Sequence, residues 1–209
     1  MNVSVGIVDY QMGNLRSVQK GIERTGNVAT ISSDPIELAK NTHLILPGVG
    51  AFGDAMMELK RRDLVGFIED WASSVKPFLG ICLGMQLLME SSSEGGDHEG
   101  LGILKGKVLR FEQPKGKPSI KIPHMGWNEV ASMIPADPML TGISSRPYVY
   151  FVHSYYVAPD DPADVWLQSE YGELFCAGVR RKSVMATQFH PEKSQKEGLR
   201  LLANWCNQL

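Results

Sequence analysis

The sequence predicts an α/β fold with three layers: a mostly parallel, open sheet flanked by helices, with a mixed or antiparallel β extension. The parallel part is predicted by the first half, because short apolar runs alternate there with segments whose apolar residues recur at helical spacing. From about residue 108 the pattern changes to short alternating strands separated by turns, which predicts the extension. The 209 residues, 43% of them hydrophobic, suffice for one full core, so we expect a single domain over residues 1–209.

The elements expected first alternate between strand and helix. Each strand is a short apolar run, and each helix begins at a residue that can cap it. In order they are a strand at 3–8, a helix begun by Asn14 and ended by Gly26, a strand at 28–31, a short helix opened by Ser33, Asp34 and Pro35, and a strand at 43–46 that ends at Pro47.

The later elements follow the same rules. One amphipathic helix has apolar residues at positions i, i+3, i+4 and i+7, namely Leu64, Phe67, Ile68 and Trp71. The remaining expectations are a strand, sharp turn and helix over 75–91, a polar loop at 91–100, turns at Tyr171-Gly172 and Arg181-Lys182, and a final helix at 196–207 with Leu199, Leu202 and Trp205 facing inward.

The turn expected near residue 82 has the spacing of a nucleophile elbow. Gly80 and Gly84 flank Cys82, and small residues at these positions let a strand and a helix pass closely while one side chain projects outward. Thiol pKa values near helix N-termini can fall to roughly 3.5–7.5, which favours a reactive cysteine. The amide of Leu83 would then donate to an oxyanion. The alternative is a buried structural cysteine.

A base and an orienting carboxylate follow the strand expected near the C-terminus. His190 and Glu192 are separated by Pro191, and residues i and i+2 of an extended chain lie on the same side. With Cys82 they supply a nucleophile, a general base and an orienting group. We expect the remaining histidines to be structural; they are His43, His98, His124 and His153.

The segment from Gly48 to Gly53 matches the GxGxxG pattern of dinucleotide-binding proteins. The pattern follows the third expected strand rather than the first, and the acidic residues about twenty positions on, Glu69 and Asp70, fall inside a helix. In the competing interpretation, Gly48, Val49 and Gly50 present backbone amides beside the elbow and complete an oxyanion hole. An ordinary turn between strand and helix is the third possibility.

Composition limits the other function classes. A net charge of −2 and a pI near 6.2 give no footprint for nucleic acid or an anionic membrane. The 3 cysteines are widely spaced, which predicts neither a disulfide framework nor a zinc site and favours a reducing, cytoplasmic compartment. The first apolar run lacks a preceding basic region, so it reads as a strand rather than a signal peptide. We expect no metal and no organic cofactor.

Five segments together carry a resemblance to class I glutamine amidotransferases. They are PGVGAFG at 47–53, GICLGMQ at 80–86, PHMGWN at 123–128, YFVHSYY at 150–156 and QFHPEKSQ at 188–195. GxCxG and HPE are shared by that whole family, including the glutaminases of anthranilate and GMP synthase. The other segments, with Met85 where a histidine often follows the elbow glycine, resemble one branch, which serves histidine biosynthesis.

The resemblance implies roles for individual residues. Cys82 would be the nucleophile, His190 the base and acid, and Glu192 the orienting carboxylate. The oxyanion would be held by the loop and elbow amides, at Val49, Gly50 and Leu83. Glutamine would be bound by Gln86, Glu94, Ser154 and Tyr155. The residues matching positions that face a partner are Asn14, Met125, Trp127, Tyr150 and Lys193.

The resemblance also implies the reaction and the partner. Glutamine would be hydrolysed to glutamate and ammonia through a thioester, and the ammonia would pass to a (β/α)8-barrel cyclase in a heterodimer. Three alternatives remain: a glutaminase subunit for another synthase, such as anthranilate synthase, a dinucleotide-binding oxidoreductase, and a non-catalytic interaction protein.

Overall fold

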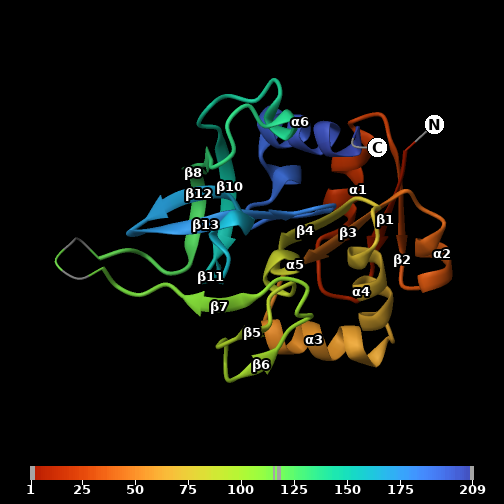
Figure 1. Ribbon diagram of the computed structural model, residues 1–209, viewed down its shortest axis with the longest axis horizontal. Coiled ribbons are helices and arrows are strands. Elements are labelled where there is room, and N and C mark those ends of the chain that lie inside the picture. The colour runs from red at the N-terminus through yellow and green to blue at the C-terminus, as the bar shows by residue number, and fades with distance from the viewer. Residues whose placement is uncertain (1–2, 115, 117–118, 208–209) are drawn as a thin grey trace.

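A large mixed sheet runs through the centre of the computed structural model, which describes residues 3–114, 116 and 119–207 (Figure 1). Among the described residues it has 12 strands. The main spatial order is β2 (Val28–Ser32), β1 (Ser4–Val8), β3 (His43–Gly48), β4 (Phe78–Cys82), β14 (Val184–Thr187), β13 (Glu173–Arg181), β11 (Tyr155–Pro159), β7 (Gly106–Arg110), β5 (Ser91–Ser92) and β6 (His98–Glu99).

The predicted change from parallel to antiparallel pairing occurs at β14. From β2 to β14 neighbouring strands are parallel, whereas β14, β13, β11 and β7 pair antiparallel. Strand β12 (Val165–Tyr171) pairs with β13 and with β9 (Ala131–Ser132). A separate two-stranded sheet is formed by β8 (His124–Glu129) and β10 (Tyr148–His153). The mixed β extension expected from the sequence is therefore confirmed.

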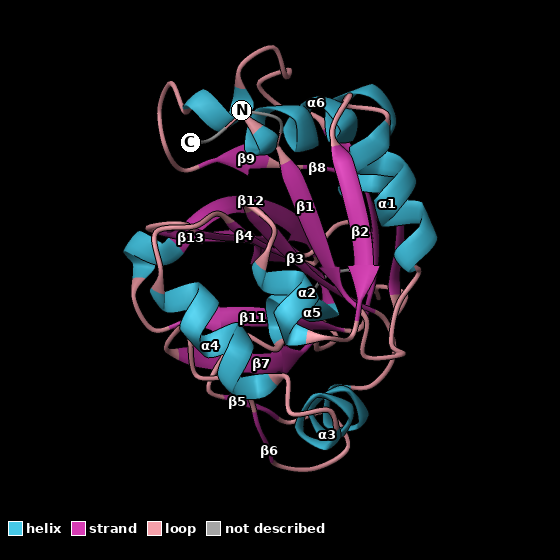
Figure 2. Cartoon of the chain, turned by 90° about the vertical axis from the view of Figure 1, so that its right-hand side faces the viewer, coloured by secondary structure: helices cyan, strands magenta, loops and turns pink. Residues whose placement is uncertain are grey.

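Helices cover both faces of the parallel part, as the three-layer prediction required (Figures 1 and 2). On one face are α1 (Leu15–Glu23) and α6 (Gln195–Cys206); on the other are α2 (Pro35–Ala39), α3 (Phe52–Arg61), α4 (Val65–Ser73) and α5 (Leu83–Gln86). Side chains alternate across β3. Leu44 and Leu46 therefore belong to the core under α2, α3, α4 and α5, whereas Ile45 belongs to the core under α1 and α6. This alternation explains why the strand is apolar throughout.

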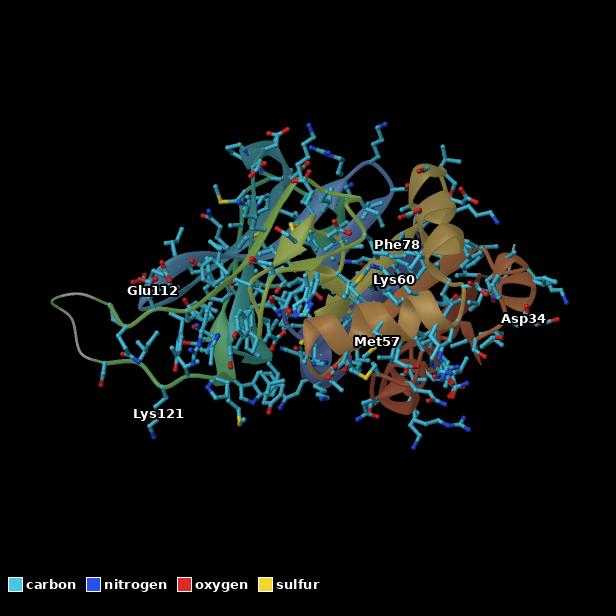
Figure 3. The ribbon with its side chains drawn as sticks, turned by 90° about the horizontal axis from the view of Figure 1, so that it is seen from below. Asp34, Met57, Lys60, Phe78, Glu112 and Lys121 are labelled. Carbon is cyan, nitrogen blue, oxygen red and sulfur yellow. The ribbon has the colours of Figure 1, made fainter. Side chains whose placement is uncertain are left out.

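The helical layers and the β extension lie at opposite ends of the molecule. Figure 3 shows Asp34 at one end of the molecule and Met57 and Lys60 between that end and the centre, whereas Glu112 and Lys121 lie toward the opposite end. The N-cap residues named from the sequence are in place: Asn14 accepts from Ser17 N at the start of α1 and Asp34 accepts from Ile36 N at the start of α2.

Strand β3 is longer than predicted, because it continues through Pro47 to Gly48. The neighbouring strand β1 pairs with β3 only as far as Ile45. The missing N–H of Pro47 therefore lies beyond that ladder and removes no hydrogen bond from it. On the other side, pairing with β4 continues to Cys82.

The elbow helix is shorter than the prediction over 75–91, since α5 has only 4 residues. Leu87, Leu88 and Met89 are buried, and their carbonyl groups accept hydrogen bonds from the backbone of residues 101–104 rather than from a further helical turn. The expected polar loop at 91–100 contains the short strands β5 and β6. In α6, Leu199 is only half-buried, whereas Leu202 and Trp205 face inward as predicted.

Gly84 offers a test of the packing between α5 and β3. A Cβ at Gly84 would overlap the carbonyl oxygen of Leu46, so Gly84→Ala is expected to lower the free energy of unfolding by about 1–3 kcal/mol. Gly66→Ala in α4 is the matched control, because a Cβ there meets nothing within 4 Å. Urea denaturation measures both, and equal effects of the two substitutions would contradict the packing argument.

Candidate active site

Cys82 lies at the sharp turn between β4 and α5, as the glycine spacing predicted. Its φ is 55° and its ψ −111°, a left-handed conformation that is strained for a residue with a Cβ. Gly84 permits the close contact with Leu46, and a Cβ on Gly80 would lie 2.9 Å from that of Ala186. Both glycines therefore allow the close packing that holds the cysteine in this conformation.

His190 and Glu192 follow the neighbouring strand β14. Nδ1 of His190 lies 2.8 Å from Oε1 of Glu192, and both side chains are almost fully buried. Glu192 belongs to a 3-10 turn, η3 (Pro191–Lys193), and α1 packs closely on it at Gly21, where a Cβ would lie 3.0 Å from Glu192 Cβ. The carboxylate therefore holds Nδ1–H and leaves Nε2 for chemistry.

The protonation of the His190 ring depends on Cys82 and Glu192. Burial lowers the pKa of His190, but the interactions with the Cys82 side chain and with Glu192 outweigh burial and raise the pKa to about 9. The ring is therefore protonated at neutral pH and can donate a proton to a group held at Cys82. The arrangement has the parts of an acyl-transfer site: a nucleophile, an acid and base, and an orienting carboxylate.

A cavity of about 330 Å³ opens beside Cys82. Its walls come from the loop after β3, the elbow, the loop between β5 and β6, and the segment joining β10 to β11. The residues that line it are Val49, Gly50, Cys82, Leu83, Gln86, Glu94, Pro123, Val152, His153, Ser154 and Tyr155. Every residue predicted for the oxyanion and for glutamine binding therefore lines one space with the cysteine.

The loop after β3 is anchored at both ends. The hydroxyl of Tyr10 donates to the carbonyl of Pro47 at 2.7 Å, and burial together with the nearby Cys82 raises the pKa of Tyr10. At the other end, Phe52 N donates to Oε2 of Glu94 at 2.9 Å. Glu94 thus caps α3, whose N-cap residue makes no side-chain cap hydrogen bond. This cap was not expected from the sequence, where the family resemblance implied only a role of Glu94 in glutamine binding.

Gln188 is a site residue that sequence reasoning did not single out. It is fully buried, its Oε1 accepts from Gln86 Nε2 at 3.1 Å, and its Nε2 lies 3.8 Å from Cys82 Sγ. Gln86 Nε2 also donates to the carbonyl of Tyr155 at 3.0 Å. The sequence feature that could have indicated Gln188 is its position two residues before His190. Residues i and i+2 of an extended chain lie on the same side.

Two histidines that were expected to be structural form a pair: His153 lines the cavity, and His124 contacts His153 from the hollow along β8. Nδ1 of His124 lies 2.9 Å from Nε2 of His153, and Nδ1 of His153 lies 2.8 Å from the carbonyl oxygen of Tyr155. Burial lowers the pKa of His124 to about 4 and that of His153 to about 3. Both rings are therefore neutral at pH 7, in contrast to His190.

The structure brings together most of the residues predicted to face a partner. Trp127 and Tyr150 are paired across β8 and β10, with ring centroids 6.0 Å apart, and Lys193 Nζ lies 6.0 Å from the Tyr150 ring. Met125, on the same strand as Trp127, is 63% exposed. Asn14 lies at the N-terminus of α1, where its side chain accepts from the backbone N–H of Ser17.

The remaining motifs lie outside the cavity. The ring of His43 packs edge-on against Trp205 with centroids 4.9 Å apart, and His98 covers Gly53 so closely that a Cβ there would lie 2.6 Å from the ring. The acidic pair considered for dinucleotide binding, at 69–70, lies inside α4 rather than at the end of a strand. That position does not suit a ribose-binding carboxylate.

The described part of the chain contains neither a candidate metal-binding cluster nor a helix suited to cross a membrane. Within residues 3–114, 116 and 119–207, no cluster of at least 3 histidine, cysteine or acidic side chains is arranged to hold a metal ion. No helix in those ranges combines the length and the apolar character needed to span a membrane.

Comparison with known proteins identifies the family. A model of the class-I glutamine amidotransferases matches residues 7–209. A protein of Rhodopirellula baltica named imidazole glycerol phosphate synthase subunit HisH is 58% identical over 97% of this chain and 96% of its own. A protein of the same name from Syntrophotalea carbinolica is 52% identical over 95% of this chain and 97% of its own. The chain belongs to the class I glutamine amidotransferases, and within them to the HisH subunits.

Solved structures show the same fold at low sequence identity. PurLQS from Thermotoga maritima aligns with a TM-score of 0.73 and 20% identity over 99% of both chains. A glutamine amidotransferase from Thermotoga maritima aligns with a TM-score of 0.61 and 19% identity, over 92% of this chain and 77% of its own. The fold class, the family and its histidine-biosynthesis branch, each predicted from the sequence, are confirmed.

The three cysteines differ in their surroundings, which gives a test of reactivity. Burial raises the pKa of Cys176 to about 12 and that of Cys206 to about 11, whereas Cys82 lines the cavity and interacts with His190. A diazoketone analogue of glutamine should therefore alkylate Cys82 at least about tenfold faster than the others. Peptide mass spectrometry reads out the labelling, with urea-unfolded chain as the control in which the preference disappears. Equal labelling in the folded chain would refute the assignment.

Proposed function

We propose that the chain hydrolyses glutamine to glutamate and ammonia through Cys82, His190 and Glu192, and delivers the ammonia to a (β/α)8-barrel cyclase subunit. The observation that carries the proposal is the placement of Cys82 at a strained elbow, beside a protonated His190 that Glu192 holds, in a cavity lined by the residues predicted for the oxyanion and for glutamine binding. The close HisH relatives support the same conclusion.

The reaction proceeds in two steps. The Cys82 thiolate attacks the side-chain carbonyl carbon of glutamine, and protonated His190 gives its Nε2 proton to the departing nitrogen as the C–N bond breaks. Ammonia leaves and a glutamyl thioester remains on Sγ. Neutral His190 then takes a proton from water, which attacks the thioester carbon and releases glutamate. The tetrahedral adduct then collapses and expels the Cys82 thiolate, while His190 keeps the proton that it took from water. This restores the starting state, with Glu192 holding Nδ1–H throughout.

The negative charge that forms on the carbonyl oxygen is held by backbone amides. The amide of Leu83 follows the nucleophile directly, as in other elbows, and the loop amides at Val49 and Gly50 approach from β3. Gly50 has a φ of 106°, which only glycine adopts without strain, so this position can turn its peptide toward the site. Removing one such donor typically costs about 10²–10³ in turnover.

The glutamine side chain and its α-carbon groups fit the same cavity. Both N–H groups of Gln86 are used by Tyr155 and Gln188, so its Oε1 is the atom that can accept from the substrate α-amino group. Glu94 adds a carboxylate for the same cation. Ser154 and the backbone of Tyr155 supply polar groups for the α-carboxylate on the opposite wall.

The cyclase partner is proposed to dock on β8 and β10. Free ammonia is largely protonated in neutral water and loses its nucleophilicity, so direct transfer to a second active site is favoured. A surface hollow of about 770 Å³ runs along β8 and includes Met125 and Trp127, and both side chains are strongly exposed for residues of their size. Large exposed apolar side chains of this kind mark interaction sites.

Cys82→Ala separates the two halves of the reaction. The variant in complex with the cyclase should lose glutamine-dependent synthesis by at least about 10³-fold, because the covalent step is removed. Synthesis from added ammonium should remain within about twofold of wild type, because the acceptor site belongs to the partner. Paired assays with glutamine and with ammonium measure both, and undiminished glutamine-dependent turnover would refute the assignment of the nucleophile.

Trp127→Ala tests the docking surface. Loss of a large aromatic side chain at the centre of an interface is expected to weaken binding of the cyclase by at least about tenfold. Ile36→Ala is the matched control: Ile36 is 71% exposed but lies on α2, at the other end of the molecule from β8 (Figure 1). Isothermal titration calorimetry gives both dissociation constants. Unchanged affinity for Trp127→Ala would exclude this face.

A further inference from the structure

The histidine pair in the small sheet forms part of a continuous hydrogen-bond chain. Asn128 Nδ2 lies 2.9 Å from the carbonyl oxygen of Glu170 and 3.4 Å from His124 Nε2. His124 Nδ1 then contacts His153 Nε2, and His153 Nδ1 contacts the carbonyl oxygen of Tyr155. The chain thus runs from the outer hollow along β8 to the wall of the catalytic cavity.

Both ends of this chain fix the positions of its protons. The carbonyl of Tyr155 can only accept, so Nδ1 of His153 carries a proton and its Nε2, in a neutral ring, accepts from Nδ1–H of His124. At the other end the carbonyl of Glu170 can also only accept, so the side-chain atom of Asn128 that faces it is the nitrogen Nδ2. The same nitrogen donates its second proton to Nε2 of His124. The two assignments agree at every link.

The carbonyl at the inner end has a second donor. Tyr155 O accepts from His153 and from Gln86 Nε2, and Gln86 continues through Gln188 toward Cys82 Sγ. The position of that single oxygen therefore sets which way the Gln86 amide is turned. If the oxygen moves, Gln86 no longer presents its Oε1 in the same direction.

We propose that His124 and His153 are positioning residues for the glutamine pocket: a neutral pair, each with its proton on Nδ1, that holds the Tyr155 carbonyl and thereby orients Gln86. The proposal rests on the proposed function, because it assigns Gln86 to the substrate. Neither ring touches the reacting atoms. Their expected signature is a change in the affinity for glutamine rather than in the chemical step.

The surroundings of the pair suit this task. The two histidines are direct cross-strand partners in β8 and β10, and the His124 ring stacks on Tyr171 at 4.0 Å and on Phe151 at 4.8 Å between centroids. Burial keeps the pKa of both rings far below neutrality. A stacked, buried and uncharged pair can hold a fixed hydrogen-bond direction without competing for the proton that His190 uses.

A spectroscopic measurement tests the proton positions in the unmodified chain. Long-range ¹⁵N correlation spectra of the full chain at pH 7 should show both rings neutral, with the proton on Nδ1, opposite to the form that free histidine prefers. Tyr171→Leu, which removes the stacked ring and leaves every link of the chain, should keep this pattern. A proton on Nε2 of either ring would overturn the proposal.

Kinetics of the complex with the cyclase test the positioning role. His124→Phe keeps a stacked ring but removes both hydrogen bonds, and should raise KM for glutamine by about tenfold with kcat within about threefold. His124→Asn, whose amide can donate to His153 in place of Nδ1–H, should restore most of the affinity. Tyr171→Leu should leave KM within about twofold.

The outcomes distinguish the positioning role of His124 and His153 from the proposed glutaminase function. Equal rises in KM for His124→Phe and Tyr171→Leu would mean that packing alone matters, which refutes positioning. An unchanged KM in His124→Phe also refutes it. Absence of glutamine hydrolysis in the wild-type complex would instead refute the proposed function, and the spectra would still decide whether the pair is neutral with its protons on Nδ1.

Discussion

The contact between α5 and β3 at Gly84 is the constraint on which the active site depends. No side chain separates Gly84 from the Leu46 carbonyl, so α5 packs directly against β3. The chain therefore turns sharply between β4 and α5, and Cys82 at this turn has a strained, left-handed backbone conformation. Parallel strands then bring the ends of β3, β4 and β14 to the same edge. The loop after β3, Cys82 and His190 are neighbours for that reason, although more than a hundred residues separate the cysteine from the histidine.

The protonation states around the cavity follow from partners rather than from burial alone. His190 and His153 are both almost completely buried, yet the pKa of His190 rises to about 9 and that of His153 falls to about 3. His190 faces Cys82 and the Glu192 carboxylate, which stabilise its charged form. His153 faces a carbonyl and another neutral ring, which cannot offset the loss of solvation. At neutral pH His190 therefore carries a proton that it can transfer, whereas the nearby His153 is uncharged.

Local patterns predicted the parts of this arrangement that are local in sequence. The alternation of strands and helices, the elbow and the i, i+2 pair of His190 and Glu192 each need only a few consecutive residues. Three features depend on distant segments and could not be predicted: the continuation of β3 through Pro47 depends on where β1 ends, the early end of α5 depends on the backbone of residues 101–104, and the histidine pair joins residues 29 positions apart. The sequence shows their residue types but not which groups they face.

Strand β10 connects the proposed docking surface with Cys82 and His190 through its own backbone. The carbonyl of Tyr150 accepts from the backbone N–H of His190, and the carbonyl of Val152 lies 4.0 Å from Cys82 Sγ. The same two residues pair across the sheet with Trp127 and Met125. Because these contacts come from the main chain of β10, a displacement of the strand would move its outer face and change its distances to Cys82 and His190 together. The small sheet is thus a wall of the active site and a support for the exposed aromatic residues at once.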